Sequence, residues 1–405
     1  MEEKKHLLHV SQNFLTNVSL TLIDFAGGII IARALGPEGK GLIFSIFFWP
    51  MLLSWIGGLG IGYANTYHIA KDPHKLPSIL GNSLLLAFTL GFTLTLVFFP
   101  LAPFLFEDKS AIPFARLYFL FFPLFILADY IGWIFTGLKN YTFFNLSRAS
   151  PRFLYLAGII ILLVTGHLNV PSVVIMRLIF SVITSLYFIF YLLKLSGFRI
   201  KVDFSLLKDS LKMSIKAHIG IVSNIGNKRA DQAFLVAFYG SEAVGLYSVA
   251  VNISSSLWHL VNAVGFTIIP SVASLEKEEI KRKVKNFTVK LLILLFPLGV
   301  VLFFISPYLI RFLYGTSFLP CLPALKILIF ASMVQGIGVI IQEALKGMKR
   351  PLLASAGGFI GTFTNLIFLA LFLPRYGITG AALASLVSYT VFSLAELYFF
   401  RKSSL

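Results

Sequence analysis

The chain has 405 residues, of which 57% are hydrophobic and only 13% are charged, yet its formal net charge is +17. Soluble domains carry about 25% charged residues, so a chain this apolar cannot cover itself with a wettable surface, and a soluble enzyme or a soluble basic nucleic-acid binder is excluded. A polytopic membrane protein whose charges lie mainly in its loops fits both numbers.

Twelve stretches of the chain are apolar and long enough to cross a bilayer, which takes roughly 20 helical residues. In chain order they lie near residues 10–34, 42–68, 79–104, 113–137, 146–165, 170–193, 214–238, 246–270, 287–306, 322–343, 352–373 and 378–400. The first has no signal-peptide cleavage pattern at its end, so we expect it to remain as a span. The fold class expected is all-α, and the short connectors leave no room for a soluble catalytic domain.

Lysine and arginine residues are unevenly distributed among the connectors. With the N-terminus in the cytoplasm, 24 of the 34 lie at cytoplasmic ends of spans and 7 at the opposite ends. Because cytoplasmic loops carry an excess of both residues, we expect a multi-pass membrane protein with both termini in the cytoplasm. The single cysteine, Cys321, allows neither an internal disulfide nor a thiolate metal cluster, and no metal or other cofactor is expected.

A shift of 204 positions aligns the two halves of the chain without gaps. The matches include helix-breaking and polar residues: Gly36–Leu42 lies over Gly240–Leu246, Asn82 over Asn286 and Pro103 over Pro307. The offset covers six spans, so both halves enter the membrane from the same side, as in the parallel repeats of some transporters. We expect two six-helix lobes, 1–193 and 213–405, joined by a basic cytoplasmic linker, 194–212. Within it, Phe204, Leu206, Leu207 and Leu211 form the apolar face of a short interfacial helix or belong to a plain solvated linker.

Three loop segments resemble the motifs of a known family. Ala32–Gly41 looks like the first loop of the bacterial polysaccharide (O-antigen type) flippases, Leu313–Phe318 like their Gly-x-x-Phe loop, and Leu373–Ala382 like their Pro-x-x-Gly-x-x-Gly-Ala-Ala loop. These flippases belong to the multidrug/oligosaccharidyl-lipid/polysaccharide exporter superfamily. The resemblance implies polysaccharide biosynthesis, as for the O-antigen of lipopolysaccharide, and a location in a bacterial or archaeal cytoplasmic membrane. An undecaprenyl-diphosphate-linked oligosaccharide would move to the outer leaflet by alternating access through a cationic central cavity.

Charged residues inside the first six spans are candidates for this cavity, because a charge in a span costs a few kcal/mol and therefore faces a cavity or a partner. Asn17, Thr21, Asp24 and Gly28 share one face of the first span, as a cavity wall or as an interhelical seam. Asp24 and Asp129 are candidates for coupling or gating.

Three arginines of the same half are candidates for substrate binding, because the guanidinium fork suits phosphate oxygens. They are Arg148, Arg152 and Arg177. For the first two, anchoring at lipid headgroups is the alternative.

In the second half, Lys228 and Arg229 are candidates for substrate binding, and Asp231 for coupling. Lys228 is the repeat equivalent of Asp24, so the two charges either pair when the cavity closes or form a permanent structural ion pair. Glu343 and His218 are further candidates for coupling. His259 and Glu396 are other titratable groups inside spans, although a lone histidine in a helix is more often a packing residue.

The expected partners are a lipid-linked oligosaccharide, membrane lipids, a proton or sodium ion for coupling, and other polysaccharide-assembly proteins, without nucleic acid. No nucleotide-binding loop or hydrolase motif is present in the sequence, so the protein is not expected to be an enzyme. The alternatives are a peptidoglycan-precursor (lipid II type) flippase, a cation-coupled multidrug exporter, a membrane polymerase or glycosyltransferase, and a structural scaffold. The polymerase requires a large outer loop that the sequence lacks.

Overall fold

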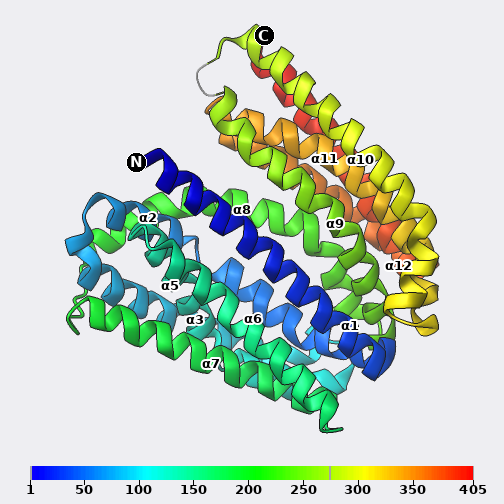
Figure 1. The fold of residues 1–405 in the computed structure, drawn as a ribbon, viewed down its shortest axis with the longest axis horizontal. Coiled ribbons are helices and arrows are strands. Elements are labelled where there is room, and N and C mark those ends of the chain that lie inside the picture. Colours follow the sequence, from blue (N-terminus) through cyan, green and yellow to red (C-terminus); the bar gives the residue numbers. More distant parts are fainter. Residues whose placement is uncertain (1, 273–274, 405) are drawn as a thin grey trace. The chain divides into compact units, whose positions relative to one another are not determined.

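The computed structural model describes residues 2–272 and 275–404, and within these ranges every regular element is a helix (Figure 1). The chain divides into two compact units, unit 1 (Met1–His218) and unit 2 (Ile219–Leu405). The boundary lies beyond the expected linker, because Phe204 already begins the long helix α8, which runs from unit 1 into unit 2. Each unit is described by itself below.

Unit 1 contains the following elements: α1 (Glu2–Gly57), α2 (Ile61–Lys71), η1 (Pro73–Lys75), α3 (Leu76–Leu105), η2 (Lys109–Ala111), α4 (Ile112–Phe119), α5 (Phe122–Gly137), α6 (Tyr141–Val164), α7 (Val170–Leu195) and the first turns of α8 (Phe204–Phe238). Unit 2 contains the rest of α8 and α9 (Ser241–Val272), α10 (Lys277–Leu313), η3 (Thr316–Cys321), α11 (Leu322–Gly347) and α12 (Pro351–Ser404).

Two of these helices are each two spans joined at a glycine. The apolar part of α1 has 43 residues, which at about 1.5 Å per residue is twice the ~30 Å of a hydrocarbon core. Gly36 breaks it with φ 67°, and Gly377 breaks the 54-residue α12 with φ 53°. Both conformations are left-handed and favour glycine. Gly41 and Gly380, in contrast, are helical.

Seven described helices are long and apolar enough to cross a membrane, or eight when α4 and α5, bent by 59°, count as one broken span. The glycine breaks divide α1 and α12 into two spans each, α2 continues the second span, and the more polar α8 and α9 complete the set. This confirms the prediction of an all-α protein with twelve spans in two six-helix lobes. The repeat is visible as well, because the 204-residue offset lays α3 on α10, each with an internal proline at the equivalent positions Pro103 and Pro307.

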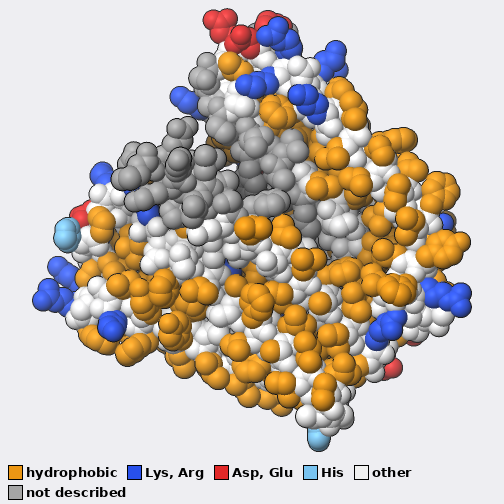
Figure 2. Space-filling model, viewed as in Figure 1, with side chains coloured by type: hydrophobic (Ala, Val, Ile, Leu, Met, Phe, Trp, Pro, Cys, Tyr) orange, Lys and Arg blue, Asp and Glu red, His pale blue; other side chains and the backbone are white. Residues whose placement is uncertain are grey.

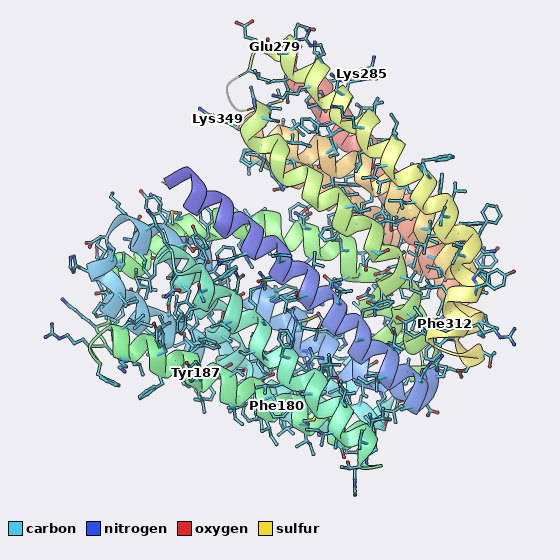
Figure 3. The ribbon with its side chains drawn as sticks, viewed as in Figure 1. Phe180, Tyr187, Glu279, Lys285, Phe312 and Lys349 are labelled. Carbon is cyan, nitrogen blue, oxygen red and sulfur yellow. The ribbon has the colours of Figure 1, made fainter. Side chains whose placement is uncertain are left out.

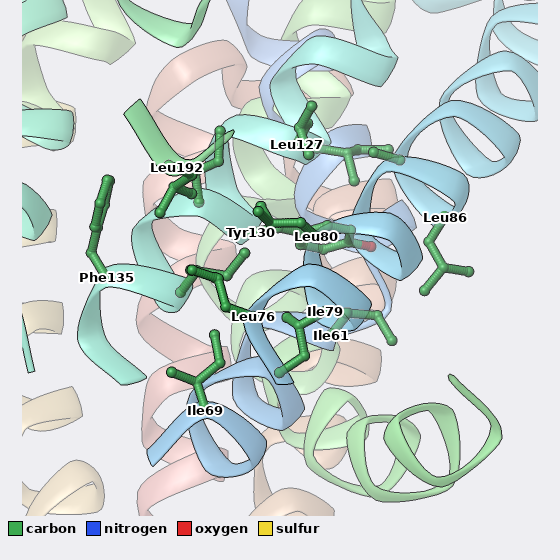
Figure 4. Packing of buried hydrophobic residues seen from close by; sticks show 14 of the residues in the cluster. Ile61, Ile69, Leu76, Ile79, Leu80, Leu86, Leu127, Tyr130, Phe135 and Leu192 are labelled. Atoms are coloured by element: carbon green, nitrogen blue, oxygen red, sulfur yellow. The ribbon is translucent and has the colours of Figure 1, made fainter. Parts of the chain in front are cut away.

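A cluster of buried apolar side chains from α2, α3, α5 and α7 forms the core of unit 1 (Figure 4). Gly91 permits the close contact of α3 with α5, because a Cβ atom there would lie 2.4 Å from the backbone nitrogen of Pro123. The start of α8 joins this core: Leu206 and Leu207 are buried in it, whereas Phe204 is 71% exposed.

The segment between α7 and α8 is held against the start of α3. Asn82 donates from Nδ2 to the Asp203 carbonyl at 2.9 Å and accepts the Asp203 N–H at 3.0 Å, and the Lys201 N–H donates to the Pro77 carbonyl at 3.1 Å. Gly81 leaves room for this backbone, since a Cβ atom there would lie 2.2 Å from the Lys201 oxygen. The end of the basic linker is therefore packed on unit 1.

Candidate functional site

The polar stripe of α1 faces two arginines of α6. Arg148 donates from Nη2 to Asn17 Oδ1 at 2.8 Å, and one turn further along Arg152 Nε lies 3.3 Å from Asp24 Oδ2. The Arg152 and Asp24 side chains remain 41% and 56% exposed. The structure thus joins three of the candidate residues in one seam, and their exposure leaves the charges of Arg152 and Asp24 accessible.

At the far end of the same stripe, Gly28 contacts a lysine that follows the break at Gly36. Lys40 is buried and donates from Nζ to the Gly28 carbonyl at 3.0 Å. A helical carbonyl already accepts a backbone bond, so this contact ties the two spans of α1 together at their turn. The sequence places Lys40 among the loop charges, and its burial was not predictable from hydropathy.

Arg177 lines a cavity inside unit 1 and lies within electrostatic range of Asp24 in this seam. Its guanidinium carbon is 4.0 Å from the Phe47 ring centroid and 5.0 Å from that of Tyr155. The cavity has a volume of about 250 Å³, and aromatic, hydroxyl and charged side chains line it, among them Phe47, Trp55, Tyr118, Phe125, Phe188, Ser54, Ser147, Ser181, Thr184, Ser185, Asp129 and Arg177. The guanidinium also shares a hydrogen bond with the Tyr155 hydroxyl, and because it carries five N–H donors, others remain for an anion.

Asp129 and His218, both candidates for coupling, have different surroundings in unit 1. Asp129 lines the cavity, accepts a hydrogen bond from Trp133 and is exposed. His218 is buried, and its Nε2 lies 2.7 Å from the Ile56 carbonyl, so Nε2 carries the proton that it donates. His218 therefore has the environment of a packing residue, whereas Asp129 has that of a cavity group.

In unit 2, Lys228 lies over an aromatic ring. Its Nζ atom is 3.7 Å from the ring centroid of Trp258, and the charged groups around it are Arg229, Glu343 and Lys346. Glu343 is already paired with Lys346, one turn away on α11, at 2.7 Å. Lys228 therefore contributes a positive charge that a ring, and not a dedicated carboxylate, stabilises.

Asp231 lies at the centre of a buried polar network that joins α8, α9 and α12. Its oxygens accept hydrogen bonds from the Tyr247 hydroxyl, from the Ser385 hydroxyl at 3.1 Å and from the Gln232 N–H at 2.8 Å. Arg229 donates from Nη1 to Gln232 Oε1 at 2.7 Å. A change in the charge of Asp231 would thus be felt directly by three helices.

One turn before Asp231, a second group of polar residues is equally buried. The Asn227 amide oxygen accepts the Ser388 hydroxyl at 2.9 Å, and this hydroxyl also lies 2.8 Å from the Gly361 carbonyl. Asn365 is 0% exposed, and its amide has no hydrogen-bond partner in the described part of the chain. Asn227 and Asp231 of α8 therefore form a buried polar contact with Ser388 and Ser385 of α12 inside unit 2.

Glu396 is a buried acid of unit 2, and the sequence did not reveal how weakly it is hydrogen-bonded. It is 0% exposed, and one oxygen accepts a long bond of 3.3 Å from the Gln342 amide. The other oxygen has no partner among the described residues. The His259 side chain lies outside the described residues. In the described ranges, no group of three or more His, Cys, Asp or Glu side chains is arranged to hold a metal ion.

Comparisons with known proteins agree with this picture. A family model described as polysaccharide biosynthesis protein matches residues 9–276. The probable low-salt glycan biosynthesis flippase Agl15 of Haloferax volcanii is 26% identical over 212 residues, which cover 49% of this chain and 44% of that protein. The chain spans less than half the length of the curated relatives that it matches.

Two solved structures show the same fold at low identity. An inward-facing multidrug resistance MATE family transporter of the MOP superfamily superposes with a TM-score of 0.79 at 18% identity, over 95% of this chain and 94% of the other. The lipid II flippase MurJ, in an inward closed conformation, gives 0.77 at 17% identity, over 96% and 89%. At these identities the similarity shows the fold alone.

Proposed function

The chain belongs to the polysaccharide biosynthesis protein family, and from this premise we propose that it is a flippase for a lipid-linked oligosaccharide. The observation that carries the proposal is that basic side chains inside the spans contact aromatic rings and not carboxylates of their own. Arg177 lies between the Phe47 and Tyr155 rings, and Lys228 lies on the Trp258 ring. An anion that enters can exchange such contacts for its own at little cost, whereas it would have to break a dedicated buried ion pair.

The finer substrate we propose is an undecaprenyl-diphosphate-linked oligosaccharide, moved from the cytoplasmic to the outer leaflet. The diphosphate is the group that needs cations, and arginine and lysine bind phosphate oxygens in complementary ways. Arg177, Lys228 and Arg229 are the residues we assign to it, with Arg148 and Arg152 nearer the entrance of unit 1. The flippase name of an archaeal relative supports glycan transport but does not separate one lipid carrier from another.

Coupling is the role that we propose for Asp231. It lies on the same helix as Lys228 and Arg229, and it connects α8 to α9 through Tyr247 and to α12 through Ser385. Uptake of a proton or sodium ion there changes the hydrogen bonds that hold three helices together. We expect this change to bias the exchange between inward-open and outward-open states in the cytoplasmic membrane, with both termini in the cytoplasm.

The direct test replaces both bases of α8. A Lys228→Ala/Arg229→Ala variant should lose export of the glycan in a flippase-null cell at a normal protein level in the membrane. The matched control is Lys349→Ala/Arg350→Ala, since these neighbours are also a lysine and an arginine but are exposed in a connector. Full export by the α8 variant would overturn the assignment of the cationic site, and equal loss in the control would show that total charge, not position, is responsible.

Multidrug export is the second candidate, and the cavity of unit 1 favours it. Five of the lining residues, Phe47, Trp55, Tyr118, Phe125 and Phe188, are aromatic, and Asp129 supplies an acid, which suits a lipophilic cation. Arg177 in the same cavity opposes a cation. Resistance of an exporter-deficient cell to cationic dyes, abolished by Asp129→Asn and unaffected by Lys228→Ala, would favour this candidate. The lipid II alternative would be tested by a rescue assay, in which the protein is expressed in a cell that lacks its own peptidoglycan-precursor flippase.

A further inference from the structure

The first turns of α10 carry a basic stripe on the outer face of unit 2. Arg282, Lys285 and Lys290 are exposed and, at helical spacing, fall on one side together with Asn286 and Val289. The neighbouring bases are engaged elsewhere, since Lys281 pairs with Glu278 at 2.7 Å and Lys283 donates to the Ser271 carbonyl at 3.0 Å. Figure 2 shows charged side chains gathered at this end of unit 2, and Figure 3 labels Lys285 there.

The same side of α10 continues as an apolar stripe. Its exposed residues are Val289 (45%), Ile293 (68%), Phe296 (62%), Phe304 (69%) and Tyr308 (76%). From Val289 to Tyr308 the helix rises about 29 Å at ~1.5 Å per residue, which equals the ~30 Å thickness of a hydrocarbon core. Figure 3 places Phe312 at the opposite end of the helix from Lys285.

This register sets the height of the bases. Lys290 lies at the edge of the apolar stripe, and Lys285 and Arg282 lie about 6 Å and about 10 Å beyond Val289 along the helix axis. The polar headgroup zone occupies roughly 5–8 Å on each side of the hydrocarbon core. The long side chains of Lys285 and Lys290 therefore end at phosphate level, where lysine and arginine extend toward the interface.

The internal repeat shows that the exposure belongs to unit 2. The equivalents of Lys285 and Asn286 in unit 1 are Gly81 and Asn82, and both are buried under the backbone of Lys201–Asp203. In unit 2 the equivalent face is open in the described part of the chain and carries a lysine in place of the glycine. A side chain of that length prevents a backbone from packing as it does in unit 1.

We propose that this stripe, Arg282, Lys285 and Lys290 with Asn286 between them, is a binding site for anionic phospholipid headgroups. Charge complementarity and continuity with the lipid-facing apolar stripe select the membrane leaflet as the occupant. Each lysine or arginine near a bilayer surface contributes about fivefold in affinity for anionic lipid. The site would order anionic lipid beside α10, independently of the transported glycan.

The single native cysteine, Cys321, is fully buried. A fluorophore attached to a Val289→Cys variant therefore reports from the edge of the basic stripe and leaves the four residues of the proposed site unchanged. The protein is reconstituted in phosphatidylcholine with a small amount of phosphatidylglycerol or phosphatidylcholine that carries a spin label at the same acyl position. Phosphatidylglycerol should quench the fluorophore several-fold more strongly. The preference should shrink with salt, because the Debye length falls from about 10 Å at 0.1 M to about 3 Å at 1 M.

The variants locate the effect. Lys285→Gln/Lys290→Gln should bring the quenching ratio close to one, and the charge-conserving Lys285→Arg/Lys290→Arg should keep it. The matched control, Arg311→Gln/Arg375→Gln, removes two exposed bases from the opposite end of unit 2 and should leave the ratio unchanged. Equal quenching by both lipids, or an unchanged ratio in the glutamine variant, would overturn the proposal. The charge-conserving variant also shows whether a lost ratio reflects charge or a disturbed fold.

Discussion

Replacement of Asp24 by Asn separates the two roles that an acid in the first span can have. The Asp24 and Arg152 charges are 3.3 Å apart, so their Coulomb attraction is about 5 kcal/mol at an effective dielectric of ~20 and about 1.3 kcal/mol in water. Both side chains are roughly half exposed. Water therefore screens most of the attraction, and the net pair is worth about 0.5–1 kcal/mol.

The assay is a double-mutant cycle on the free energy of unfolding in mild detergent, with Asp24→Asn, Arg152→Gln and the combination of both. We expect a coupling energy of about 0.5–1 kcal/mol, together with a loss of glycan export in the Asp24→Asn variant that far exceeds this small loss of stability. Asn17→Ala is the control, because it removes a neutral partner of the same seam, the acceptor for Arg148.

Two results would refute this reasoning. A coupling of about 3 kcal/mol or more would mean that the pair behaves as a desolvated structural ion pair, which its exposure excludes. Normal export by the Asp24→Asn variant would show that the charge is dispensable for transport. In that case the α1 stripe is only a seam between α1 and α6.

Three further predictions concern packing and hydrogen bonds. Gly91→Ala should destabilise unit 1 by about 1–3 kcal/mol, because the added methyl group collides with the α5 backbone; thermal unfolding measures it, and an unchanged midpoint would contradict the contact. Tyr247→Phe should cost about 0.6 kcal/mol, the average for hydrogen bonds between membrane helices, and no more than about 1.7 kcal/mol; the cost should vanish in an Asp231→Ala background. Trp258→Leu should weaken export more than Trp258→Phe, because phenylalanine keeps a ring face for Lys228; equal activity of the two would exclude the cation–π contact from the mechanism.

Hydropathy and charge predict the fold of this chain well, because lipid imposes its requirement on each span separately. A span must be apolar over about 20 residues whatever it packs against, so the twelve stretches and the repeat are readable without tertiary information. The glycine breaks at Gly36 and Gly377 follow from the same local chemistry, since only glycine adopts their backbone conformation without strain. Gly41 and Gly380 look the same in sequence but are helical, because the chain has already turned at Gly36 and Gly377.

The candidate site is only partly readable from sequence, because helical periodicity gives the face of a helix but not its neighbour. Helical spacing puts Asn17 and Asp24 on one face of α1, yet nothing in the sequence indicates that they meet Arg148 and Arg152 of α6. Partner identity is a long-range property that one sequence does not carry. Lys346 illustrates the converse, since it reads as a positive-inside anchor but pairs with Glu343.

The repeat gives these contacts a common meaning. Asp24 and Lys228 occupy equivalent positions, and each has acquired a partner inside its own unit: a guanidinium for the acid and an indole ring for the base. Had the two charges been retained only to pair with each other, neither would need a partner inside its own unit, because each would already be satisfied by the other. Separate partners keep both charges stable when they are apart. A transporter that alternates between two states requires this stability in each of them, and a static scaffold does not.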